Sequence, residues 1–154
     1  MTTEIRSALF SAGVIAAVAF LLHLPWEFAH SMLYQCFPDG VAFSKEAFIV
    51  MHFRAALGDA LLTLLLLALG MVILRSPDWW QHPTRRQMVF LALGGALLAV
   101  AIEYDAVFVA HRWVYADTMP TIFGIGLSPM LQLALLPFLT IVISQRFLRR
   151  PRVY

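Results

Sequence analysis

The sequence predicts an all-α integral membrane protein, a single domain of four transmembrane helices in an up-down-up-down bundle. Of the 154 residues, 61% are hydrophobic and only 13% are charged, and the mean hydropathy is +0.79. A soluble domain has close to half apolar residues and about a quarter charged ones. The apolar residues also fall into four runs, each long enough to span a bilayer. These observations together favour a membrane bundle over a soluble fold.

The four helices are expected over residues 7–34, 47–74, 87–115 and 122–148. Each is long enough to cross a membrane with some tilt. The segments between them contain the Pro, Asp and Gly residues that are typical of helix breaks. The first apolar run lacks a small-residue cleavage site and continues into polar residues, so we interpret it as a retained helix rather than a signal peptide.

Basic residues indicate the orientation of the bundle. Most lie on the side shared by the N-terminus, the middle connection and the C-terminus: Arg6, Arg75, Arg85, Arg86, Arg146, Arg149, Arg150 and Arg152. The opposite side carries only Lys45, Arg54 and Arg112. The positive-inside rule therefore predicts that both termini are cytoplasmic. Interfacial aromatic belts are expected at Trp79 and Trp80 on the inner side and at Trp113 and Tyr115 on the outer side. We expect a bacterial inner membrane as the location, with membrane lipids as neighbours and a homo-oligomer as one assembly that the sequence allows.

Several functional classes are disfavoured by the sequence. The chain has little polar surface on which a basic stripe for nucleic acid could form. Cys36 is the only cysteine, so it can form neither an internal disulfide nor a CxxC redox pair, and we interpret it as a loop residue. No serine or cysteine nucleophile motif, phosphate loop or dinucleotide fingerprint is present.

Ionisable residues nevertheless occur inside the predicted spans, with helical spacing. They are His23, Glu27 and His30, with Tyr34 on the same stripe, in the first helix; His52, Asp59 and Thr63 in the second; Glu103, Asp105, His111 and Arg112 in the third; and Ser128 and Gln132 in the fourth. Ionisable groups inside a membrane are costly unless they are paired or hydrated, and by default they mark a functional site.

Counting at about 1.5 Å per residue sorts these residues into two layers in the outer half of the bundle. His30, His52 and His111 lie roughly 6–8 Å from the outer helix ends, with Glu27 slightly deeper. One residue from each helix lies roughly 16–18 Å deep: His23, Asp59, Glu103 and Gln132. The inner halves hold almost nothing ionisable, which predicts a dead-end site that opens to the extracytoplasmic side.

One hypothesis for this site is a bound metal. Glu27-x-x-His30 matches half of the motif of di-metal helix bundles, and its ligand types suit zinc, iron or manganese. The metal ligands would be Glu27, His30, His52 and His111. A second Glu-x-x-His is missing from the sequence.

A second hypothesis is acid–base catalysis by Glu103, Asp59 and His23 on a small or lipophilic substrate. Deep burial disfavours a charged carboxylate, which makes Glu103 and Asp59 the better proton carriers. The placement of His23, Glu27 and Glu103 resembles the layout of the sterol-isomerase-like (EXPERA) membrane proteins, which are also small helical bundles with a His…Glu pair and a second acid in the membrane. The resemblance is one of layout and carries no activity with it.

Two further alternatives stay open. Histidines on facing helices, such as His30 with His111 or His23 with His52, could ligate haem in a haem or quinone electron-transfer subunit. Intramembrane Asp, Glu and His residues are also typical of proton or divalent-cation transport.

Asp105 and Arg112 share a helix face seven residues apart and are expected to form an ion pair.

Overall fold

The computed structural model describes residues 3–35 and 44–148, with side chains from residue 5 onward. Cys36 and Arg149, Arg150 and Arg152 therefore lie outside the described residues. Within the described part the chain is mostly helical, and four helices are long and apolar enough to cross a membrane. They are α1 (Thr3–His30), α2 (Lys45–Ile73), α3 (Arg85–Tyr104) and α4 (Leu127–Leu148). The predicted class, a helical protein with four candidate membrane spans, is confirmed.

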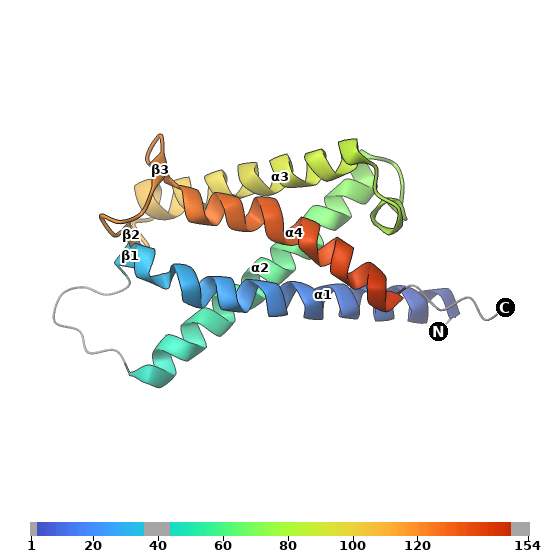
Figure 1. The fold of residues 1–154 in the computed structure, drawn as a ribbon, viewed down its shortest axis with the longest axis horizontal. Coiled ribbons are helices and arrows are strands. Elements are labelled where there is room, and N and C mark those ends of the chain that lie inside the picture. The colour runs from blue at the N-terminus through green and yellow to red at the C-terminus, as the bar shows by residue number, and fades with distance from the viewer. Residues whose placement is uncertain (1–2, 36–43, 149–154) are drawn as a thin grey trace.

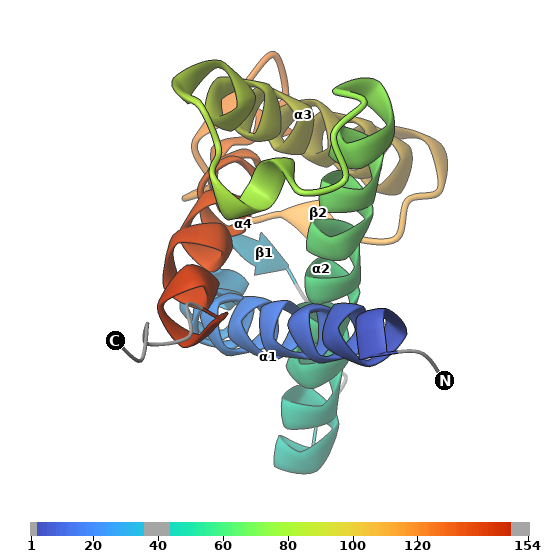
Figure 2. The same ribbon diagram turned by 90° about the vertical axis from the view of Figure 1, so that its right-hand side faces the viewer.

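The helices form an elongated bundle in which α2 is strongly inclined. Along the long axis α1 and α3 run in one direction and α2 and α4 in the other, so that α1 begins at the end where α4 finishes (Figure 1). The closest packing is between α1 and α2, α1 and α4, and α3 and α4, whereas α2 touches α3 and α4 less. Figure 2 shows the N-terminal end of α2 extending past α1. The four helices are therefore spread more widely at this end than parallel helices would be.

Local sequence signals explain where α2 and α3 begin. Ser44 caps α2 by accepting a hydrogen bond from the amide of Ala47 at 3.2 Å. Thr84 and Gln87 form a capping box at the start of α3, in which each side chain bonds the backbone amide of the other residue. Such caps satisfy amides that have no partner inside the helix. Both caps stand within three residues of the predicted helix starts.

The predicted end of the third helix is wrong. The α-helix ends at Tyr104, a π-helical turn η3 (Asp105–Val109) follows, and the chain then becomes extended in β2 (Val114–Tyr115). β2 pairs with β1 (Tyr34–Gln35), which follows a short 3₁₀ turn η1 (Ser31–Leu33) after α1. This antiparallel pair satisfies backbone groups that a longer helix would otherwise use, and apolar periodicity alone does not reveal such pairing.

The predicted start of the fourth helix is also wrong. Residues expected at the start of the helix form a hairpin of β3 (Thr121–Ile122) and β4 (Ile125–Gly126), and α4 begins only at Leu127. Both turn residues have positive φ, 51° at Phe123 and 80° at Gly124. Positive φ at both central residues defines the type I′ turn that matches the twist of two-residue hairpins.

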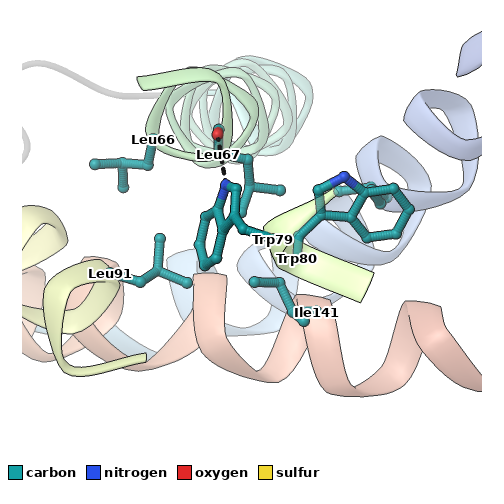
Figure 3. Close-up of a cluster of buried hydrophobic side chains, with 7 residues drawn as sticks. Leu66, Leu67, Trp79, Trp80, Leu91 and Ile141 are labelled. Carbon is teal, nitrogen blue, oxygen red and sulfur yellow. Dashed lines mark hydrogen bonds between the residues drawn. The ribbon is translucent and has the colours of Figure 1, made fainter. Parts of the chain in front are cut away.

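A hydrophobic core fills the end of the bundle opposite to β1 and β2. The 3₁₀ turn η2 (Trp79–Gln81) places Trp79 and Trp80 inside this core, beside Leu66, Leu67, Leu91 and Ile141 (Figure 3). The indole N–H of Trp79 donates to the carbonyl of Leu67 at 3.3 Å. The two tryptophans, expected in an interfacial aromatic belt, are instead buried in the protein. The aromatic ring of Trp79 fits because Gly70 has no side chain, since a Cβ there would lie 2.6 Å from it.

Substituting two neighbouring glycines of α3 is expected to have different effects on stability. A Cβ on Gly95 would lie 1.8 Å from the carbonyl oxygen of Leu133, whereas one on Gly94 would make an ordinary 3.7 Å contact with Leu66. We therefore expect Gly95→Ala to lower the free energy of unfolding by about 2–3 kcal/mol through overpacking. Gly94→Ala should be neutral or slightly stabilising, because alanine favours a helix more than glycine does. Thermal unfolding in detergent measures both, and equal losses would contradict the packing.

Candidate functional site

A cavity of about 380 Å³ lies between all four helices, at the end that carries β1 and β2. It is lined by carboxyl, imidazole, amide and aromatic groups as well as aliphatic ones. The polar and aromatic residues that line it are Glu27, His30, Ser31, Tyr34, His52, Asp59, Glu103, Arg112, Trp113 and Gln132. Small-ligand sites have volumes of about 300–1,000 Å³ and combine an apolar lining with a few convergent polar groups. The cavity fits this description.

Gln132 of α4 connects the polar groups on one wall of the cavity. Its side-chain nitrogen lies 2.8 Å from Glu27 Oε1, 2.7 Å from Asp59 Oδ2 and 3.1 Å from His23 Nδ1. The other imidazole nitrogen of His23 lies 3.1 Å from the hydroxyl of Thr63. His23 is fully buried behind the cavity wall. Of the four residues predicted for the deeper layer, His23, Asp59 and Gln132 lie together and are joined by Glu27, whereas Glu103 bonds other groups.

Two carboxyl groups of this wall converge on one amide nitrogen. The Gln132 amide nitrogen carries two hydrogens but faces three acceptor atoms. The carboxyl oxygens Glu27 Oε1 and Asp59 Oδ2 are therefore neighbours, since they lie 2.8 and 2.7 Å from this one nitrogen. Two carboxylates this close repel each other when both are ionised, and one proton shared between them would remove that repulsion. The opposite orientation of the amide would place its oxygen against both carboxyls and would require two protons.

Glu103 faces the same cavity but has a different environment. Its carboxylate accepts hydrogen bonds from the hydroxyl of Tyr115 at 2.6 Å, the hydroxyl of Tyr34 at 3.3 Å and the indole N–H of Trp113 at 3.3 Å. The Glu103 side chain is buried, with 4% of its surface exposed. Because these three partners are neutral donors, the carboxylate of Glu103 acts as a hydrogen-bond acceptor. Since Tyr34 and Tyr115 are paired in the β1–β2 ladder, the two strands build this environment.

Both tyrosines are expected to remain protonated donors far into the alkaline range. Burial, followed by the neighbouring carboxylate of Glu103, raises the pKa of Tyr34 above its ordinary value. Burial and the hydrogen bond to Glu103 raise the pKa of Tyr115 in the same direction. An ultraviolet titration should therefore show no tyrosinate from either residue near pH 10, where an ordinary tyrosine is half ionised. A Tyr34→Phe/Tyr115→Phe double variant that removes tyrosinate absorbance at this pH would contradict the expectation.

The four predicted metal ligands do not converge. Glu27 and His30 are in contact, with His30 Nε2 lying 3.2 Å from Glu27 Oε1 and His30 Nδ1 lying 3.1 Å from the hydroxyl of Ser128. His52 also lines the cavity, but its Nδ1 bonds the carbonyl of Phe48 at 2.7 Å. Across residues 3–35 and 44–148, no three His, Cys, Asp or Glu side chains are arranged to hold a metal ion. The geometry therefore gives no support to a site made of Glu27, His30, His52 and His111.

His111 lies outside the site, contrary to the prediction. It is exposed, its φ is 49° and its Nδ1 bonds the carbonyl of Val107 at 3.0 Å. The prediction failed because it continued the third helix through the π-helical turn. It also placed Glu103 too deep, since this residue stands one position before the end of α3.

The predicted ion pair between Asp105 and Arg112 is confirmed. The guanidinium of Arg112 donates to the carboxylate of Asp105, and both side chains are about half exposed. Arg112 also lies over the ring of Trp113, 5.4 Å from its centroid, and lines the cavity. The pair therefore attaches the segment that carries Trp113 to the turn that follows α3.

Sequence reasoning missed the aromatic part of the site. Trp113 and Tyr115 were interpreted as interfacial anchors, although Tyr34 was placed on the polar stripe of the first helix. The signal that could have identified them is the concentration of three aromatic donors in two short segments that flank the helix ends near Glu103.

Compared with known protein families, curated proteins and solved structures, this chain matches none. These comparisons give no support to the resemblance to the EXPERA proteins.

Proposed function

We propose that this protein is an integral membrane enzyme that transfers a proton to or from a small, mainly apolar substrate bound in the cavity. The observation that carries the proposal is the convergence of the Glu27 and Asp59 carboxyl groups on the amide nitrogen of Gln132, at 2.8 and 2.7 Å. A carboxyl pair with one proton can act as donor in one step and as acceptor in the next. The cavity volume of about 380 Å³ suits a small ligand.

Two acidic settings in one cavity support an acid–base mechanism. In this mechanism the Glu27–Asp59 pair holds a transferable proton, whereas Glu103 accepts three hydrogen bonds. Acid and base roles are commonly divided between carboxyl groups whose environments favour opposite protonation states. We propose that the pair exchanges the proton with the substrate and that Glu103 stabilises positive charge that develops on it. His23 would orient Gln132 from behind the wall.

The orientation proposed for the bundle follows from its basic residues. Arg6, Arg75, Arg85, Arg86 and Arg146 gather at the end of the helices remote from the cavity. Under the positive-inside rule, a bacterial inner membrane would hold this end and both termini on the cytoplasmic side. The cavity would then face the extracytoplasmic half of the bilayer.

Proton or cation transport is the second candidate, because buried Asp, Glu and His residues also line such pathways. The core around Trp79, Trp80 and Ile141 argues against it, since it closes the bundle between the cavity and the opposite end. A transport pathway needs access from both sides, and an enzyme site needs it from one. The packing therefore favours the enzyme.

The proposal can be tested without knowing the substrate. Purified protein in lipid nanodiscs is incubated in D₂O with a lipid extract of the expression host, and mass spectrometry identifies compounds that gain deuterium at carbon or change isomer. A proton-transfer enzyme labels its substrate within a few turnovers, whereas protein with Glu27→Gln should not. Absence of any enzyme-dependent label, together with proton flux in liposomes, would favour transport instead.

A further inference from the structure

The β3–β4 hairpin carries an aromatic side chain that is fully exposed and whose backbone has a disfavoured conformation. Phe123 is 101% exposed and stands at the tip of the hairpin. Its φ of 51° lies in the left-handed region, which is disfavoured for a bulky residue and which Asn, Asp or Gly adopt more readily. A large apolar ring fully exposed to water at such a position would have no evident benefit. This combination points to an environment other than water.

The position of the hairpin along the bundle indicates which environment that is. α4 begins directly after the hairpin and has 22 residues, which span about 33 Å at 1.5 Å per residue. This length is close to the roughly 30 Å hydrocarbon core of a bilayer. If α4 crosses the membrane, its first residue, Leu127, lies near one edge of the hydrocarbon, and the hairpin lies at the same level.

The hairpin also points in the direction required for contact with lipid. Figures 1 and 2 both show it projecting sideways past the end of α3 rather than along the axis of the bundle. Gly124 lies against Phe108, since a Cβ there would be 3.2 Å from the ring. Phe108 and Val109, at the end of the third candidate span, and Ile122 in the hairpin are themselves exposed. The apolar surface of the third span thus continues onto the hairpin.

We propose that the tip of the hairpin inserts Phe123 into the headgroup–acyl boundary of the bilayer that the four helices cross. Aromatic side chains partition favourably into this layer. The proposal rests on the four helices crossing a membrane and is independent of the chemistry of the cavity. The base of the hairpin is nevertheless joined to the site, because the amide of Gly126 donates to the Tyr115 hydroxyl that bonds Glu103.

Fluorescence quenching tests the proposal on the full chain in vesicles of phosphatidylcholine and phosphatidylglycerol. In a Cys36→Ser background, a polarity-sensitive fluorophore is attached at Phe123→Cys or, as control, at Thr118→Cys in the exposed turn before β3. Nitroxides placed near the headgroup on lipid acyl chains should quench the label at 123 several-fold more than the label at 118. Aqueous iodide should show the reverse order.

A second pair of variants separates the contribution of Phe123 from that of the apolar label. The fluorophore is attached at Ile122→Cys, with Phe123 either retained or replaced by Asn, which tolerates the positive φ of the turn. Lipid quenching should fall when the ring is removed. Iodide quenching at 123 equal to that at 118 would overturn the proposal, because the tip would then lie in water. Protection from both quenchers would also overturn it, because protein, either residues 36–43 or a second copy of the chain, would then cover the tip.

Discussion

Glu27→Gln is expected to reduce enzyme-dependent deuterium incorporation by about 10²–10⁴-fold, the usual contribution of a positioned general acid or base. The amide keeps the size and the hydrogen bonding of the side chain but cannot carry the transferable proton. Asp59→Asn should have an effect of similar size, because the proposed mechanism needs one proton shared between the two carboxyl groups, which meet at Gln132. Initial rates of label incorporation in nanodiscs, measured on the substrate found in the D₂O experiment, provide the comparison.

The double variant gives the sharper result. Two groups that act as one unit have non-additive effects, so Glu27→Gln/Asp59→Asn should be no slower than the slower single variant. Glu46→Gln, on the exposed first turn of α2, is the matched control and should leave the rate unchanged. If the single effects multiplied in the double variant, the two carboxyl groups would act separately and the shared-proton mechanism would be wrong.

The sequence predicted the helical fold well because its signals are local. Four long apolar runs fix four candidate spans, and the cap residues Ser44 and Thr84 stand close to the predicted starts of α2 and α3. The remaining boundaries depend on pairing between distant segments. Tyr34 and Tyr115 are 81 positions apart in the chain and lie opposite each other in one ladder, and single-sequence periodicity contains no information on that contact.

The candidate site was predicted in part for the same reason. Helical spacing and depth correctly grouped His23, Asp59 and Gln132, because these residues lie within regular helices whose geometry can be counted. The count failed beyond Tyr104, where the π-helical turn ends the regular spacing. It therefore misplaced His111 and did not detect the bonds from Tyr115 and Trp113 to Glu103.

Gln132→Leu is expected to be among the most destabilising polar substitutions in the chain, lowering the free energy of unfolding by about 3–5 kcal/mol, as removal of one partner from a buried charged network does. Leucine has a similar volume but leaves Glu27, Asp59 and His23 without the amide that faces all three. Buried acceptors that lose their donor retain the full desolvation cost. Denaturant titration in detergent measures the change.

Gln145→Leu provides the matched control on the same helix. Gln145 donates to the backbone carbonyls of Trp80 and Gln81 at 2.8 and 3.0 Å, at the partly exposed end of the bundle. Its replacement should cost about 1 kcal/mol, the typical net value of a hydrogen bond.

Infrared spectroscopy adds a readout that a merely structural role would not change. The C=O band of the protonated carboxyl group should move to higher frequency in Gln132→Leu and stay unchanged in Gln145→Leu, because Gln132, unlike Gln145, donates to the Glu27–Asp59 pair. Equal losses of stability with an unshifted band in both variants would show that Gln132 does not hold the proton in place.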